Sequence, residues 1–295
     1  MYKRQFANKE IDALEIDSDA DAYQTAKQRS DASIQTSAGL TWTHVTLNGA
    51  KGPLKSVLVR QAIGHAINRK VISESSNTPV GAPAEQQDSY IFMPGQKGYQ
   101  DDATPSIGYS PTKAKALLKQ AGYTQGSDKS WSKGGTPLTL TMTIPADTPS
   151  NKQRAVQVQA DLKDIGVTVT LNEVPAAKFF NYVIKGDFEM TGFSWVGTAY
   201  PIGTTEPLFY PLHAGSNFTG ITEKKLGAMW DAANAELDPT KRIVLANKID
   251  KELFSYAPII PIAPLPNVYA VKKGLVNYGA AQFQAPDWTT VGFAK

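Results

Sequence analysis

Apolar residues recur every three to four positions over residues 57–73 (VLVRQAIGHAINRKVIS), which predicts one amphipathic helix. Its apolar face would carry Val59, Ile63, Ala66, Ile67 and Val71. Residues 110–122 predict a second helix with clear ends. Ser110 is a good N-cap, Pro111 suits the first turn, and Gly122 stops the pattern after Leu117 and Leu118, which we expect to be buried.

A strand, a helix and a strand follow along the chain. Apolar and polar residues alternate over residues 138–144 (LTLTMTI) and 167–174 (VTVTLNEV). Between them Val158, Leu162 and Ile165 have helical spacing, and Gly166 ends that helix. Strands joined by such a helix lie parallel, with a right-handed crossover. With a helix near residues 176–184 and a strand at 188–192, this predicts a small open α/β sheet, which binds ligands beyond the carboxyl ends of its strands.

The last third of the chain predicts two helices, at residues 222–237 and 239–255, joined at Asp238 as N-cap and Pro239 as first helical residue. The proline-rich stretch IIPIAPLP (residues 259–266) then leads to a final strand at 267–271. A stiff, extended segment of this kind is typical of a crossing between domains.

The alternation of residues 188–192 ends in a loop rich in glycine and proline, FSWVGTAYPIGTTEPLF (residues 193–209). Its large side chains, Trp195 and Tyr200, are either plugs of the core or the wall of a binding site. Aromatic loop residues at a strand end supply contact area at low entropy cost, and nearby Thr, Ser and Asn supply hydrogen bonds. Because Gly197, Pro201 and Gly203 indicate an exposed loop, we favour the wall.

Composition excludes several classes of function. The 295 residues suffice for two domains or one large α/β unit, and 30 Lys and Arg against 27 Asp and Glu give a charge of +3 without any basic block. This disfavours a nucleic-acid partner. No Cys is present, which excludes disulfides and thiolate chemistry, and the longest apolar run is broken by prolines and too short to span a bilayer.

The start of the chain, MYKRQFANKE, is polar and has no apolar signal core. It fits either a cytoplasmic protein or a chain whose true N-terminus is missing. We favour the second interpretation, because MYKRQ matches the translation of a transposon adapter used in sequencing libraries. We therefore expect a fragment, with residues 1–5 derived from the adapter.

Candidate metal sites in the sequence are weak. Asp17, Asp19 and Asp21 imitate the first half of a calcium loop, but Ala22 stands where Gly must make the turn and Gln28 where a bidentate Glu is needed. An acidic turn or helix start is the better interpretation. The three histidines, which are far apart in sequence, are better explained as packed or surface imidazoles than as metal ligands; they are His44, His65 and His213.

Candidate nucleophiles are weak as well. Ser110 and Lys113 form an S-x-x-K, but the other β-lactamase motifs are absent and helix capping explains both residues. Ser194 in GFSWVG is not a nucleophile elbow, because the second Gly comes one residue late. No phosphate-binding loop is present. Binding without catalysis is therefore the leading class, no cofactor is expected, and a serine hydrolase is the alternative.

Five segments resemble, in the same order, motifs of the solute-binding proteins of oligopeptide and dipeptide ABC importers (solute-binding protein family 5). PLKSVLVRQAIGHAINRKVI resembles the V-R-Q-A-I-x-x-A-I-D-R segment of that family, with Asn68 in place of Asp. The other four, whose order makes the resemblance specific, are FANKEIDALEI, YSPTKAKALLKQAGY, LKDIGVTVTL and the long stretch from SNFTGITEKKL to APIIPI.

The resemblance implies an α/β fold, the periplasmic-binding-protein-like type II clamp, whose two lobes close over a peptide. It implies that residues 1–47 are the tail of a partial first lobe, that 48–263 form a complete second lobe, and that 264–295 return to the first. It also implies a monomeric, extracytoplasmic protein, periplasmic or lipid-anchored as a lipoprotein, which delivers peptides to permease subunits in the membrane. A ligand-sensing receptor on the same fold is a further alternative.

The family's W-x-x-D loop, whose Trp lines the cleft and whose Asp pairs with the α-ammonium of the peptide, aligns with Trp195 to Thr198. Thr198 has no charge, and only Glu189 or Glu206 could replace the missing acid. We therefore expect a ligand without a free amino terminus: a blocked or cyclic peptide, or another polar metabolite. The expected substrate-binding residues are Ser194, Trp195, Val196, Gly197, Thr198, Tyr200 and Asn217.

Overall fold

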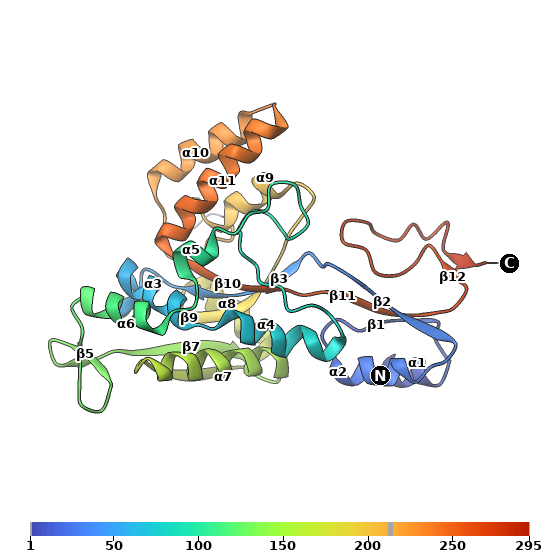
Figure 1. The fold of residues 1–295 in the computed structure, drawn as a ribbon, viewed down its shortest axis with the longest axis horizontal. Helices are drawn as coiled ribbons and strands as arrows, with labels where there is room; N and C mark the ends of the chain where they lie inside the picture. Colours follow the sequence, from blue (N-terminus) through green and yellow to red (C-terminus); the bar gives the residue numbers. More distant parts are fainter. Residues whose placement is uncertain (1, 212–214, 295) are drawn as a thin grey trace.

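The computed structural model describes residues 2–211 and 215–294. Its centre is a five-stranded sheet of order β10-β3-β9-β7-β8 (Figure 1). The strands are β3 (Thr41–Leu47), β7 (Thr139–Pro145), β8 (Thr168–Val174), β9 (Met190–Val196) and β10 (Ile259–Pro264). β7 pairs parallel with both β8 and β9, whereas β3 runs antiparallel to β9 and β10. The α/β class and the parallel β7–β8 unit are thus confirmed.

Helices cover both faces of this sheet. On one face, Leu140 and Met142 of β7 pack with α7 (Pro149–Asp164) in the main core, which also contains α3 (Val57–Ala66) and α6 (Pro111–Gln120). On the other face, Phe193 packs with α8 (Ala176–Lys185) in a smaller cluster. The side chains divide between the two clusters because neighbouring residues of a strand point to opposite faces of the sheet.

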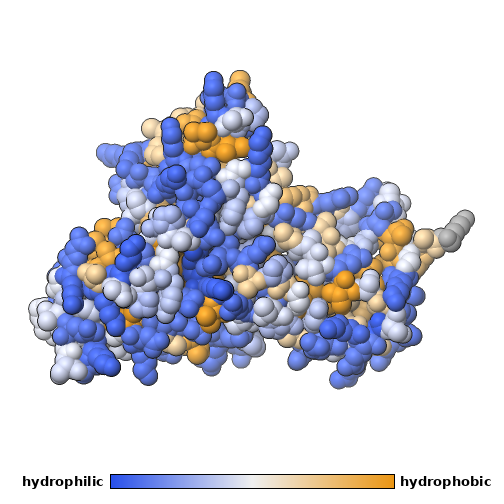
Figure 2. All heavy atoms as spheres, in the orientation of Figure 1, coloured by the Kyte–Doolittle hydropathy of each residue, from blue (hydrophilic) through white to orange (hydrophobic). Residues whose placement is uncertain are grey.

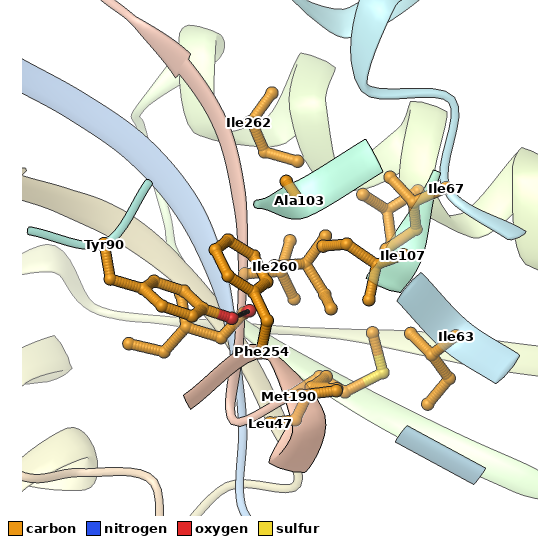
Figure 3. Packing of buried hydrophobic residues seen from close by; sticks show 14 of the residues in the cluster. Leu47, Ile63, Ile67, Tyr90, Ala103, Ile107, Met190, Phe254, Ile260 and Ile262 are labelled. Atoms are coloured by element: carbon orange, nitrogen blue, oxygen red, sulfur yellow. Dashed lines mark hydrogen bonds between the residues drawn. The ribbon is translucent and has the colours of Figure 1, made fainter. Parts of the chain in front are cut away.

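The main core extends beyond the sheet to the helices of the last third. Figure 3 shows Tyr90 beside Phe254 of α11 (Pro239–Tyr256). The Tyr90 hydroxyl donates to the carbonyl of Ile259. Trp230 of α10 (Lys224–Ala235) is completely buried. Asp238 caps α11 as expected, accepting from the backbone N–H groups of Thr240 and Lys241 at 2.8 and 3.0 Å.

A second, smaller unit contains the first and the last elements of the chain, and we call it the arm (Figure 1). The sheet β1-β11-β2 joins both ends of the chain, and around it Phe6, Leu14 and Val268 form a separate apolar cluster. The arm comprises α1 (Tyr2–Ala7), β1 (Ala13–Glu15), α2 (Ala20–Lys27), β2 (Ala32–Ser37), β11 (Asn267–Lys272), β12 (Leu275–Val276) and β13 (Gly292–Phe293).

The remaining elements are short. They are η1 (Gly52–Lys55), α4 (Arg69–Asn77), η2 (Thr78–Val80), α5 (Ala103–Ile107), β4 (Thr124–Gln125), β5 (Trp131–Lys133), β6 (Thr136–Pro137), α9 (Pro201–Thr205) and η3 (Glu206–Leu208). Among them, β4, β5 and β6 form a small three-stranded sheet of their own. Among the described residues, no helix is both long and apolar enough to cross a membrane.

The prediction of one helix over residues 57–73 is wrong. Ile67 adopts an extended conformation after α3, and Asn68 begins α4, where its side-chain oxygen accepts from the Val71 backbone N–H at 3.3 Å. The break turns α4 away from the face of α3, so Val71 is exposed instead of buried. The helix at Pro111–Gln120 begins at Ser110 as predicted, with Leu118 buried and Leu117 only half-buried.

The proline-rich stretch is more than an extended connection. Residues up to Pro264 form β10, an edge strand that pairs with β3, and only Leu265 and Pro266 separate it from β11 in the arm. An edge strand tolerates proline, because one side of it needs no ladder hydrogen bonds. The stretch does pass from one sheet to the other. The lobe limits 1–47, 48–263 and 264–295 stay a prediction. β3 falls in the segment 1–47, which was assigned to the first lobe, but it belongs to the five-stranded sheet.

Candidate functional site

The candidate site lies at the carboxyl end of β9. The sequence placed the end of this strand near residue 192, but β9 continues to Val196, because its N–H and C=O groups pair with β3 as far as Thr41. The predicted loop therefore begins later, and it contains α9 and η3. Phe193 and Trp195 point to one face of the sheet, whereas Ser194 and Val196 point to the other.

Four aromatic side chains form a continuous cluster on the first of these faces, in which Phe193 is buried, and we call it the aromatic wall: Phe180, Phe193, Trp195 and Phe218. The ring of Trp195 lies nearly parallel to that of Phe218, at an angle of 12° and a centroid distance of 5.9 Å. Phe193 meets Trp195 edge to face at 5.0 Å, and Phe180, half-exposed on α8, meets Phe193 at 5.6 Å. Trp195 itself is only partly buried, so it contributes both to the core and to the surface.

His44 of β3 lies behind the wall. Its ring is stacked on Trp195 at 5.9 Å and 11°, and its Nδ1 lies 3.2 Å from the Thr46 hydroxyl. Burial, and next the positive charge of Arg154, lower the pKa of His44 to about 3. The imidazole is therefore neutral. The buried His44 Nε2 and Trp195 Nε1 have no hydrogen-bond partner among the described residues.

A second loop, residues 89–98, fastens the end of β9. The Gln96 side-chain amide donates to the carbonyl of Thr198 at 2.7 Å. Outside this loop, the Gly197 N–H donates to the carbonyl of Leu40, just before β3, at 2.8 Å. A Cβ at Gly197 would lie 2.7 Å from Cγ of Met93, so this close approach requires glycine. The residue therefore has a packing role beside the site.

A pocket of about 330 Å³ opens next to this junction. Ala199 and Pro201 line it from the β9 side, Gln96 and Lys97 from the second loop, and Phe283 from the C-terminal segment. That segment is held close by the Gln282 side-chain amide, which donates to the carbonyl of Pro94 at 3.0 Å. Figure 2 shows the outline of the molecule hollowed at the inner corner between the α10–α11 pair and the arm. The described lining residues include a cation and no acid.

The side chains of Thr198 and Tyr200 have different surroundings. The Thr198 hydroxyl lies 3.0 Å from the Thr204 hydroxyl and accepts from the Tyr200 N–H at 3.1 Å, so it is engaged in building the start of α9. The Tyr200 side chain is 84% exposed, which excludes a core plug at this position. Val196 is likewise exposed.

Asn217 is buried, and its hydrogen-bonding groups are used inside its own loop. Its amide group donates to the carbonyls of Phe209 and Ile221, both at 2.9 Å, and its oxygen accepts from the N–H and hydroxyl of Thr219. The structure thus gives Asn217 the role of holding the segment that carries Phe218 against Trp195.

Both acids that could replace the missing Asp accept hydrogen bonds from other parts of the structure. Glu189 lies just before β9, at the opposite end from Trp195 and about 20 Å away along the strand, and its carboxylate accepts from the Thr141 N–H at 2.8 Å. The Glu206 carboxylate accepts from the Asn234 side chain of α10 at 2.8 Å. Each carboxylate therefore already has a structural partner.

The weaker candidates have structural roles. Ser110 accepts from the Lys113 backbone N–H at 3.3 Å as the N-cap of α6, and Asp19 accepts from the Ala22 N–H at 2.9 Å as the N-cap of α2. His65 is buried in α3, with its Nδ1 2.6 Å from the carbonyl of Gly108. His213 lies outside the described residues. Within the described ranges, no cluster of three or more potential metal ligands is formed.

Sequence reasoning missed Phe180, Phe218 and the closeness of His44. An alternating strand pattern at residues 41–47 could have assigned His44 to a sheet face, but its pairing with Phe193 depends on a strand distant in sequence. Phe180 would be ambiguous from sequence alone, because it sits beside the buried Phe179 on the same helix.

Comparisons with known proteins identify the family of the chain and its fold. The model of the family "Bacterial extracellular solute-binding proteins, family 5 Middle" matches residues 3–217. The chain belongs to this family. It is 31% identical over 290 residues to the oligopeptide-binding protein OppA of Mycobacterium tuberculosis, covering 98% of the chain and 48% of that protein.

Solved structures share the fold. The periplasmic EDTA-binding protein EppA matches with a TM-score of 0.87 and 22% identity, covering 99% of this chain and 56% of that one. The oligopeptide-binding protein AppA of Bacillus subtilis, solved with a nonapeptide, matches with a TM-score of 0.79 and 20% identity over 100% of this chain and 58% of that one. The chain thus has the fold of family 5 proteins and spans about half the length of the curated relatives it matches.

The family motif on α3 and α4 has a structural explanation here. Arg60 donates to the carbonyls of Tyr256 and Leu54, both at 2.8 Å, and so ties α3 to the end of α11. Asn68 caps α4 through its side-chain oxygen, a role that the Asp usual in this family would also fill.

Proposed function

We propose that this chain is part of the substrate-binding component of an ABC importer. It captures a peptide at the aromatic wall, in a cleft completed by the other lobe, and delivers it to permease subunits in the membrane. We further propose that it acts outside the cytoplasm as a monomer, anchored by a lipid or free in the periplasm. The full protein would extend beyond residues 1–295.

The observation that supports this proposal is the position of Trp195. The residue that matches the Trp of the family's W-x-x-D loop lies at the carboxyl end of a central strand, part of an aromatic surface that is partly open to solvent. Large aromatic side chains that are already held in place bind an extended peptide with little further loss of conformational entropy.

Trp195, Gly197, Thr198 and Tyr200 form the proposed contact surface, and Ser194 and Val196, which we also propose as substrate-binding residues, lie on the opposite face of β9. Asn217 contributes by positioning Phe218. The exposed Tyr200 and Val196 are free to contact a ligand or the facing lobe.

We also propose that the ligand lacks a free amino terminus. A desolvated ammonium needs a countercharge, and without one it loses several kcal/mol. Thr198 provides no charge and its hydroxyl is engaged locally, while Glu189 and Glu206 have partners elsewhere. We therefore expect an N-acetylated peptide to bind at least as tightly as the same peptide with a free amino group.

Isothermal titration calorimetry of the full-length protein, with both lobes present, against matched free and N-acetylated peptides tests this expectation. A strong preference for the free amino terminus would show that an acid from another part of the protein binds the ammonium. Failure of all peptides to bind, with intact fold, would contradict peptide capture itself. Gene neighbours that encode permeases and ATPases distinguish import from a ligand-sensing receptor.

Truncation of Trp195 provides a separate prediction. We expect Trp195→Ala to weaken peptide binding by about 1 to 3 kcal/mol, because aromatic anchors at the centre of an interface dominate its binding energy. Trp195→Phe should retain most of the affinity, since it keeps the contact with Phe218. Calorimetric titration measures both.

The matched control is Trp288→Ala in the arm, an exposed tryptophan distant in sequence from the wall. Its affinity should equal that of the unmodified chain. Because Trp195 is partly buried, thermal unfolding of each variant must accompany the titration. Global unfolding of Trp195→Ala together with full binding by Trp195→Phe would mean that the residue acts only in the core.

A further inference from the structure

A second pocket, of about 460 Å³, lies among α3, α5, α6 and the end of α11. These helices pack on one another at the end of the molecule away from the arm (Figure 1). The described lining residues include no member of the aromatic wall and none of the residues around the pocket beside Ala199. Small-molecule sites have volumes of about 300 to 1,000 Å³. The pocket therefore has room for a small ligand at a place separate from the candidate site.

His65 of α3 lines this pocket, and its ring is held in one position. Its Nδ1 lies 2.6 Å from the carbonyl oxygen of Gly108, so this nitrogen carries the hydrogen and donates it. The backbone carbonyl of His65 accepts from the Ser110 N–H at 2.7 Å. In a neutral imidazole the other nitrogen, Nε2, is then an acceptor, and it becomes a donor when the ring takes up a proton. One ring nitrogen is thus left for a ligand, and its role depends on protonation.

Lys113 of α6 lines the same pocket and brings a positive charge to it. Its backbone N–H is capped by Ser110, and its side chain is exposed. Burial lowers the pKa of His65, and the charge of Lys113 acts in the same direction, against the hydrogen bond to Gly108. The imidazole is therefore neutral at pH 7. The described lining contains no Asp or Glu that would balance the charge of Lys113.

Uncharged polar groups and an apolar side complete the pocket. The Gln61 side-chain amide donates to the carbonyl of Ser255 at 3.0 Å and so ties α3 to the end of α11. The other lining residues are Ser106 and Gln120, which are polar, and Pro105, Ala116, Leu117 and Phe254, which are apolar. A cation with several neutral donors suits an oxyanion, and an apolar side suits the carbon body of an organic molecule.

From these contacts we propose that the pocket binds a small organic anion, with its carboxylate or phosphate group between Lys113 and His65 and its apolar body against Leu117. The inference is independent of the proposed function, since the two sites share no described residue. An oxyanion beside Nε2 favours the protonated imidazole, so binding takes up a proton and is stronger at lower pH. Among the elements packed around His65, α6 brings a charged residue into the lining, whereas α5 and α11 bring uncharged ones.

Three probes test the proposal by calorimetric titration of the full-length protein, with both lobes present. They are benzoate, methyl phenyl phosphate, and benzamide as the neutral isostere of benzoate. At pH 6 we expect the preferred anion to bind about tenfold more tightly than benzamide, and the stronger of the two anions identifies the head group. Both anions keep one negative charge at pH 6 and pH 8, so a weakening of about fivefold at pH 8 reports the proton taken up by the protein.

Lys113→Gln should remove the preference for anions while leaving the affinity for benzamide within about twofold. Lys119→Gln is the matched control, because Lys119 is exposed on the same helix and does not line the pocket. It should keep the full preference. His65→Gln, whose amide can still donate to the carbonyl of Gly108, should bind the anion equally at the two pH values.

Equal binding of the three probes, or binding of none, would overturn the proposal. So would a preference for anions that survives in Lys113→Gln, or a pH dependence that survives in His65→Gln. Thermal unfolding monitors each variant, and if His65→Gln does not fold, the result for Lys113→Gln decides alone. Lys113→Gln should bind peptides as the unmodified protein does, so the failure of either proposal is distinguished from the failure of the other.

Discussion

Replacing Arg69 by Ala should lower the free energy of unfolding by about 3 to 5 kcal/mol, the usual effect of removing one partner from a buried ion pair. Arg69 is 2% exposed, and one nitrogen of its guanidinium donates to the Asp88 carboxylate at 2.9 Å and to the carbonyl of Gln87 at 3.0 Å. The variant leaves both acceptors without this donor. Gln87 and Asp88 stand at the start of the segment that carries Gln96, whose side chain holds the end of β9. We therefore also expect weaker ligand binding.

Urea unfolding measures the change, with Lys70→Ala as control on the same helix. Lys70 forms an exposed pair with Glu74 at 3.8 Å, and such pairs contribute little. A loss below about 1 kcal/mol in Arg69→Ala would show that Asp88 and Gln87 find water or other donors, and that the segment does not depend on α4.

Asp250 predicts an unusual dependence of stability on pH. Its carboxyl is completely buried in α11, accepts from the Tyr90 N–H at 2.9 Å, and leaves Oδ2 without a partner among the described residues. Burial raises its pKa to about 7, with Asp102 acting in the same direction. Since the folded pKa exceeds the unfolded value of about 3.9, its contribution is complete below pH 4 and is lost as pH rises through 7.

His44 has the opposite effect. Its folded pKa of about 3 lies below the unfolded value, so its contribution is complete above about pH 6.5 and is lost as pH falls toward 3. The two residues therefore oppose each other between about pH 4 and 6.5. Asp250→Asn removes one of them, and we expect its stability relative to the unmodified chain to rise by on the order of 4 kcal/mol between pH 4 and pH 8.

Urea unfolding at pH 4, 6 and 8 tests this prediction, and the same substitution at the exposed Asp231 is the control. The measured quantity is the pH dependence of the difference between variant and unmodified chain, which cancels any constant effect of the new amide. A difference that stays the same at all three pH values would mean that Asp250 is ionised in the folded protein at pH 6.

Local patterns predicted much of the architecture. Alternation over residues 138–144 and 167–174, with helical spacing between them, was enough for β7, α7, β8 and their parallel pairing. The N-caps at Ser110 and Asp238 could be predicted equally well from the sequence, because a capping side chain accepts from backbone N–H groups only two or three residues away.

The predictions failed where distant residues decide. The helix over residues 57–73 is broken at Asn68, whose backbone N–H donates to the Asp161 carboxylate of α7 at 2.8 Å. Likewise, β9 extends through Trp195 because β3 pairs with it along its whole length. The spacing of apolar residues along the chain contains no information about hydrogen-bond partners or strand partners that are distant in sequence.

The sequence by itself determined the class of fold and the family, and it predicted Trp195 as a site residue, because motif order and strand and helix periods are properties of consecutive residues. Only the tertiary structure decided what surrounds Trp195. Phe218 and His44 stack on its ring, and Thr198 is occupied by its own loop. The stacking contacts join segments far apart in the chain, and the local pattern of residues does not encode them.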